Sequence, residues 1–73
     1  MPLYQQVAAD IRRQVEAGVL KPGDRLPSTR QLIAQYEVSE TVIRMAMVVL
    51  RTDGTVVGVP GKGVYIAENP AGQ

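Results

Sequence analysis

Polar side chains that can bind anions and base edges lie close together in the middle of this chain. Glu40, Thr41 and Arg44 fall within about one helical turn, and Arg51 follows two turns later. Residues four apart share one face of an α-helix, so these side chains form a polar face that opens at the helix N-terminus. Arginine can bond a guanine edge or a phosphate, and threonine can contact bases or the thymine methyl group. The pattern favours a DNA contact for Arg44 and Thr41.

The same residues also have a simpler interpretation. Glu40 and Arg44 can pair across one turn of a solvated helix, which contributes about 0.2–0.5 kcal/mol. Phosphates repel a carboxylate, yet a carboxylate can accept a hydrogen bond from cytosine N4, so we expect Glu40 mainly to stabilise the helix terminus and orient Arg44. Ser39 stands where an N-cap is needed, which alone would explain it, and its position also brings it near a phosphate.

Two further places carry a cation that can reach DNA. Arg30 lies at the start of another predicted helix, whose N-terminus favours anions, although an ordinary solvated arginine is the plainer interpretation. Lys62 stands between Gly61 and Gly63, where small residues permit close approach to a minor groove; a hairpin turn with a solubilising lysine is the alternative. The candidate DNA-binding residues are Arg30, Ser39, Glu40, Thr41, Arg44, Gly61 and Lys62.

Composition argues against other chemistries. The chain has no cysteine and no histidine, which removes disulfides, thiol nucleophiles, imidazole bases and the usual zinc ligands. The run 58–63 lacks the glycine spacing, and the Ser or Thr after the lysine, that a phosphate-binding loop requires. The carboxylates are scattered and no nucleophile has an oriented base, so we expect no enzyme and no cofactor.

Length and charge set the class of protein. Seventy-three residues allow one core and one domain. Eight Lys and Arg against seven Asp and Glu leave a net charge of +1, so a DNA-binding function depends on where the charges lie. The longest apolar run, 45–50, is too short to cross a bilayer, and a cytoplasmic location fits.

Apolar spacing and turn residues predict the elements that position these side chains. A helix over 3–17 is followed by a turn at 21–24, and Ser28 then caps a second helix, with Gln31 completing a capping box. After a turn at 37–38, Ser39 caps a third helix that ends at 53–54. Extended β-branched runs over 55–59 and 64–67, joined by a Gly-rich loop, predict a hairpin. The expected core residues are Tyr4, Val7, Ala8, Ile11, Val15, Leu20, Leu26, Leu32, Ile33, Tyr36, Ile43, Ala46, Met47 and Leu50.

This order of elements predicts an α+β, mostly helical fold: a winged helix-turn-helix of three helices plus a C-terminal β-hairpin wing over 1–67. Residues 68–73 show no apolar pattern and are expected to be a linker or a frayed tail. The third helix carries a second apolar line of Val42, Met45 and Val49. Packing by the first helix and the wing would cover this line, whereas an exposed line would indicate a partner surface.

Over 3–67 the chain resembles the N-terminal winged-helix domain of the GntR family of bacterial transcription regulators. The combined run at 18–28 is more specific than the helix-turn-helix alone. The resemblance is carried by LYQQV at 3–7, GVLKPGDRLPS at 18–28, Arg30-Gln31-Leu32, Val38-Ser39 with Thr41 and Arg44, and GKGVY at 61–65.

The resemblance implies that the third helix lies in the major groove and the wing tip in the minor groove. It places Arg30, Ser39, Thr41, Arg44 and Gly61 at family contact positions, with Lys62 beside them. Two residues depart from the family pattern: Glu40, where the family often has Arg, and Val42, where it often has Thr. Without an Arg at position 40 a phosphate or guanine contact is lost, so the operator sequence should not be copied from better-known relatives.

The expected function is sequence-specific binding of double-stranded DNA at an inverted repeat, most often to repress transcription. Two domains, possibly as a homodimer on the operator, would each occupy one half-site. Family members usually continue into a C-terminal domain that binds a small effector and dimerises, and we expect no small-molecule effector site within these 73 residues. The alternative is a winged-helix protein-interaction module that does not bind DNA, which the near-neutral charge and Glu40 favour.

Overall fold

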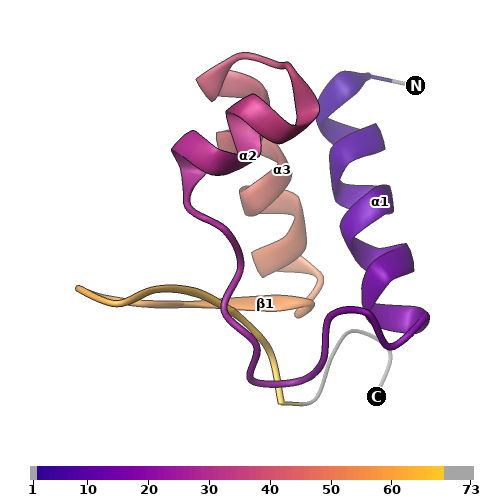
Figure 1. Ribbon diagram of the computed structural model, residues 1–73, viewed down its shortest axis with the longest axis vertical. Helices are drawn as coiled ribbons and strands as arrows, with labels where there is room; N and C mark the ends of the chain where they lie inside the picture. The colour runs from indigo at the N-terminus through magenta and orange to yellow at the C-terminus, as the bar shows by residue number, and fades with distance from the viewer. Residues whose placement is uncertain (1, 69–73) are drawn as a thin grey trace.

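Three helices and a two-stranded hairpin make up the structure, a computed structural model that describes residues 2–68 (Figure 1). The elements are α1 (Leu3–Glu16), α2 (Thr29–Tyr36), α3 (Glu40–Thr52), β1 (Val56–Val59) and β2 (Gly63–Ile66). Their order confirms the predicted winged helix-turn-helix. The predicted tail at 68–73 lies outside the described residues, apart from Glu68.

Side-chain caps define where α2 and α3 begin. Ser28 Oγ accepts a hydrogen bond from the Gln31 amide at 3.1 Å, and Gln31 Oε1 accepts one from the Ser28 amide at 2.8 Å, which confirms the predicted capping box. Ser39 Oγ accepts from the Val42 amide at 3.2 Å and caps α3 in the same way. Between the two helices Glu37 adopts the left-handed conformation, with φ 55° and ψ 49°, and so ends α2.

The hairpin is antiparallel and starts and ends one residue away from its predicted bounds. Val56 pairs with Ile66, and Val59 pairs with Gly63. Thr55 was predicted as a strand residue, but its amide instead donates to the Leu50 carbonyl and the Asp53 carboxylate, so it closes the end of α3. At the other end Gly63, predicted as loop, belongs to the ladder.

Residues 24–26, which the sequence predicted as the end of a turn and the residues after it, pair with β2 along the edge of the hairpin. The Leu26 amide donates to the Val64 carbonyl at 2.8 Å, and the Ile66 amide donates to the Asp24 carbonyl at 2.8 Å. The preceding turn places Gly23 at φ 86°, a conformation that glycine adopts without strain. The connection between α1 and α2 is therefore fastened to the wing.

Apolar side chains from all five elements and from Leu26 form one core. The predicted helical positions are largely confirmed, although Tyr4, Val15, Leu20, Ile33 and Tyr36 are only partly buried against it. The buried core residues are Val7, Ala8, Ile11, Leu26, Leu32, Ile43, Ala46, Met47, Leu50, Val56 and Ile66.

Two partly buried carboxylates tie α1 to the rest of the fold. Asp53 accepts from Arg12 Nε at 2.8 Å and from the Thr55 hydroxyl at 2.6 Å. Burial alone would raise the pKa of Asp53, but the bonds from Thr55 and Arg12 outweigh it and lower that pKa. These bonds join the start of the wing to α1.

The second carboxylate joins α1 to α2. Asp10 accepts from the Tyr36 hydroxyl at 2.6 Å, from Gln14 at 3.0 Å and from Arg13 at 3.1 Å. The hydrogen bond from Tyr36 lowers the pKa of Asp10, while burial and the facing carboxylate raise the pKa of Tyr36 to about 12.

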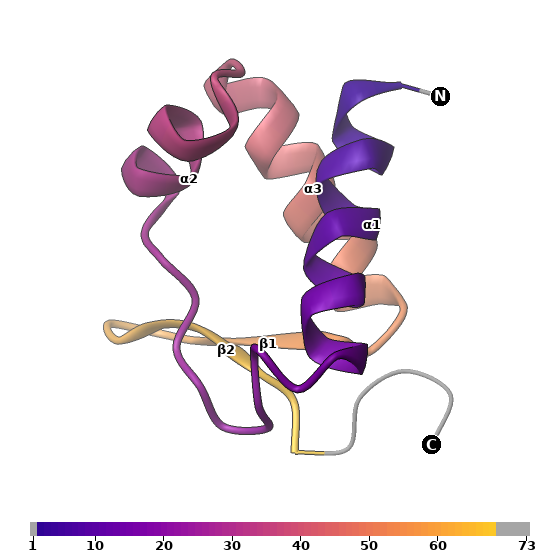
Figure 2. The ribbon, with the colours of Figure 1, turned by 45° about the vertical axis from the view of Figure 1, so that its right-hand side comes forward.

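The helix α3 has α1 on one side and the wing on the other. Figures 1 and 2 both show α1 packed along one side of α3, with the wing tip projecting from the opposite side. Among residues 2–68, no helix combines the length and the apolarity that a membrane-spanning segment requires.

Candidate functional site

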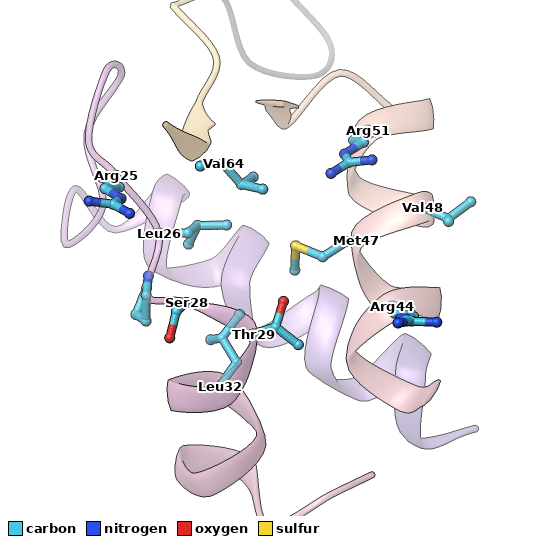
Figure 3. A pocket seen from close by; sticks show the side chains of 12 residues that line it. Arg25, Leu26, Ser28, Thr29, Leu32, Arg44, Met47, Val48, Arg51 and Val64 are labelled. Atoms are coloured by element: carbon cyan, nitrogen blue, oxygen red, sulfur yellow. The ribbon is translucent and has the colours of Figure 1, made fainter. Parts of the chain in front are cut away.

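A groove, here named the α3 groove, opens between the N-terminus of α2, the helix α3 and the base of the wing. Its volume is about 470 Å³, and Figure 3 shows α2 and α3 as its facing walls. The lining residues are Arg25, Leu26, Pro27, Ser28, Thr29, Leu32, Arg44, Met47, Val48, Arg51, Gly63 and Val64.

The α3 groove has an apolar floor and a cationic rim. The buried side chains of Leu26, Leu32 and Met47 face the gap between its walls (Figure 3). Arg25 lies on the side of the segment that precedes α2, and Arg51 projects from the last turn of α3. Charges of one sign beside an apolar wall focus the electric field, so this rim attracts an anionic ligand.

Arg44, Val48 and Arg51 follow one another along one face of α3. Their spacing of four and then three residues places them in line, and Figure 3 shows Arg44 and Val48 pointing away from α2. Val48 is 60% exposed although it is aliphatic. An exposed methyl-bearing side chain between two arginines offers apolar contact beside hydrogen-bond donors, a combination that suits thymine next to guanine or phosphate.

A second hollow, here named the wing hollow, continues this surface to the tip of the hairpin. It is an open depression with a volume of about 710 Å³. Arg25 and Arg51 line both cavities and so connect α3 to the wing. The wing hollow is lined by Arg25, Arg51, Gly58, Val59, Pro60, Gly61, Lys62, Gly63 and Val64.

Glycines in the wing make room for these two arginines. A Cβ at Gly63 would lie 3.1 Å from Arg25 Nε, and one at Gly58 would lie 3.3 Å from Arg51 Nη2. Gly63 also has φ 132°, a conformation that side-chain-bearing residues rarely adopt. Both guanidinium groups therefore rest against the bare backbone of the hairpin.

The cations of this surface differ in their partners. Arg44 forms an ion pair with Glu40 one turn earlier on α3. Within the described part of the chain, Arg25, Arg51 and Lys62 have no carboxylate within ion-pair distance. Three charges thus remain available to an anionic partner.

The predicted site residues fall into three groups. Arg44 lines the α3 groove, while Gly61 and Lys62 line the wing hollow. Ser39, Glu40 and Thr41 are exposed at the N-terminus of α3, and Arg30 is exposed in the first turn of α2. Neither cavity is lined by Arg30, Ser39, Glu40 or Thr41.

Sequence reasoning missed the two arginines that connect these groups. Arg51 was placed on the polar face but not among the candidate site residues, and Arg25 was noted only within the family-like run at 18–28. Their shared signal is a glycine on the opposing wing strand, at Gly58 and at Gly63. That pairing depends on the long-range fold and could not be recognised from the local pattern.

The second apolar line on α3 is mostly covered. Val42 and Val49 pack against the core, as the account based on intramolecular packing predicted. Met45 remains 42% exposed. Two of the three residues that would form a partner surface are therefore already packed against the core.

Comparisons with known proteins agree with this geometry. A family model described as "Bacterial regulatory proteins, gntR family" matches residues 3–66. The Exu regulon transcriptional regulator of Escherichia coli (strain K12) is 40% identical over 67 residues, which are 92% of this chain and 26% of that protein. The histidine utilization repressor of Klebsiella aerogenes is 38% identical over 72 residues, which are 99% of this chain and 30% of that protein.

A solved structure gives the same fold in a complex. The DNA-binding domain of AraR, crystallised with operator ORX1, superimposes with a TM-score of 0.88 at 31% identity, over 92% of this chain and 81% of that one. Thus the chain is similar throughout to regulator domains, but it spans only about a quarter to a third of the length of the Exu regulon regulator and the histidine utilization repressor.

Proposed function

Because the chain belongs to the gntR family of bacterial regulatory proteins and is a DNA-binding domain of that family, not an enzyme, we propose that it reads a specific operator. In this proposal α3 enters the major groove and the wing tip contacts the minor groove. The operator is an inverted repeat, and each half-site binds one domain.

The cationic surface that runs from α3 to the wing tip is the observation that carries the proposal. In this proposal Arg44 supplies the donor for a guanine edge, and Arg25 and Arg51, which line both cavities, contact the DNA backbone. Lys62 extends the same charge to the hairpin tip. Arg30 adds a cation at the N-terminus of α2, which itself favours a phosphate.

The relatives support the biological side of the proposal. Some of them are named as repressors, for example of histidine utilization and of a mannosyl-D-glycerate transport/metabolism system. We propose that this domain likewise serves repression in a bacterial cytoplasm, within a regulator that pairs on its operator. Alone, the domain should bind weakly, because it lacks the avidity of a paired partner and its net charge is low.

Substitution of Arg44 tests this function. Duplexes selected from a randomised pool by the domain serve as the probe, and fluorescence anisotropy measures the affinity. Arg44→Ala should weaken binding by ~1–3 kcal/mol, about 5- to 150-fold, if Arg44 reads a base. Arg13→Ala removes the same charge from α1 and is the matched control, which should bind as the unsubstituted domain does.

Salt dependence separates DNA binding from the protein-interaction alternative. Contacts to phosphates release counterions, so affinity should fall steeply as salt rises. Equal affinity of both variants, or binding that ignores salt, would contradict the proposal and favour an apolar protein partner instead.

A further inference from the structure

Glu40 is an acidic residue at the N-terminus of α3, beside Arg44 of the cationic surface. The two side chains pair across the first turn of α3, and they are 57% and 74% exposed. Of the arginines that line the α3 groove, Arg44 is the one with an ion-pair partner in the described residues. Arg44, the arginine proposed to reach a base edge, therefore differs from Arg25 and Arg51 in having a carboxylate partner.

The pair changes what DNA must supply at this point of α3. In solution water satisfies the exposed carboxylate, but a docked duplex displaces that water and brings phosphates nearby. An unpaired carboxylate then costs binding energy. Only a base edge that donates a hydrogen bond can compensate Glu40 while Arg44 bonds an acceptor.

A G·C base pair meets both requirements in the major groove. Guanine offers O6 and N7 as acceptors for Arg44, and cytosine offers its N4 amino group as a donor for Glu40. Adenine presents its N6 donor beside a single acceptor, N7, so Arg44 would lose there the bidentate contact that guanine O6 and N7 provide. Thymine offers an acceptor and a methyl group, which leave Glu40 without a partner.

We propose that Glu40 is a specificity-determining residue, which selects cytosine beside the guanine bound by Arg44 and lowers affinity for all other DNA. The proposal rests on the DNA-binding function given above and adds a base preference to it. Glu40 acts twice: it holds Arg44 before binding, and it rejects sites that offer no donor.

Two measurements on Glu40→Gln test the proposal. On a random-sequence duplex at about 50 mM salt, the variant should bind roughly three- to tenfold more tightly, because one negative charge near the phosphates is gone. In selection from a randomised duplex pool, its preference for cytosine should weaken in favour of adenine, because the glutamine amide can accept from adenine N6 and donate to N7. Glu16→Gln removes an equal charge from the exposed end of α1 and should change neither result.

A second variant keeps the charge but shortens the reach. Glu40→Asp retains an acidic residue in the first turn of α3, so it should bind random duplex like the unsubstituted domain while its cytosine preference weakens. Circular dichroism checks that each variant is folded. Glu40→Gln results equal to those of Glu16→Gln in both measurements would overturn the inference and leave the function intact. Failure of the unsubstituted domain to bind any duplex would overturn the proposed function and this inference with it.

Discussion

The two sides of α3 use the same residue type in opposite ways. On the α1 side, Arg12 pairs with Asp53 and Arg13 pairs with Asp10, and both carboxylates also accept hydrogen bonds from neighbouring side chains. On the wing side, Arg25 and Arg51 rest against wing glycines, with no carboxylate partner among residues 2–68. Pairing thus distinguishes arginines that hold the fold together from arginines available to a ligand.

This difference explains how a chain of net charge +1 can present a cationic surface. Its acidic residues offset the arginines of α1, whereas Glu40 is the acidic residue that pairs with an arginine of the α3 groove. Net charge averages over both sides and hides the asymmetry. The α1 side should govern stability and the wing side should govern DNA binding.

The largest expected effect is on DNA affinity, when two arginines are neutralised on the wing side of α3 and not on the α1 side. The double variant Arg25→Gln, Arg51→Gln should bind duplex DNA roughly 10- to 100-fold more weakly at low salt. The negative slope of log affinity against log salt should become less steep by about 1.8, because two phosphate contacts are lost. Titrations of a labelled random-sequence duplex at several salt concentrations measure both values.

The matched double variant, Arg12→Gln with Arg13→Gln, removes the same charge from α1. It should be less stable because Asp53 and Asp10 lose partners, yet bind DNA with an unchanged salt slope while folded. If both double variants lost affinity equally, bulk charge would explain binding and the contrast between the two sides would fail.

Asp53→Asn should have the next largest effect, on stability alone. The pKa of Asp53 is lowered from its ordinary 3.8, so its contribution is present above that pH and is lost as pH falls through the folded-state pKa. At pH 7 the variant should lose about 1–2 kcal/mol in free energy of unfolding, and the gap should close in acid. Urea denaturation between pH 7 and pH 2 measures this, and a gap independent of pH would contradict it.

Tyr36→Phe should have the smallest effect, a loss in free energy of unfolding that becomes smaller at alkaline pH. The pKa of Tyr36 is raised from 10.0 to about 12, so its contribution is complete below pH 10 and is lost as pH rises through 12. The variant should be about 1 kcal/mol less stable at pH 8, and the difference should shrink above pH 10. Parallel stability curves for the two proteins up to pH 12 would refute the role of the Tyr36 bond to Asp10.

Local signals predicted most of the fold correctly. The Ser28 capping box and the Ser39 cap are interactions between residues three apart, so sequence spacing reveals them. The core face of α3 repeats with the helical period, and all four of its predicted residues are buried. Such features need no knowledge of the rest of the chain.

Long-range contacts account for what the sequence did not reveal. The hydrogen bonds that join Asp24 and Leu26 to β2 span about forty residues of chain, and nothing in the local turn pattern indicates them. They also bring Arg25 onto Gly63 and thereby complete the surface that connects α3 with the wing. Arg44 could be selected from its helix face alone, whereas Arg25 required the fold.

The DNA-binding surface can be mapped by amide NMR shifts of the labelled domain, followed while a random-sequence duplex is added at low and then moderate salt. We expect salt-sensitive shifts at Arg25, Arg30, 39–44, Arg51 and 61–63, with Arg12 and Arg13 unmoved. Shifts centred on α1, or none at low salt, would contradict a DNA-binding surface on the wing side of α3.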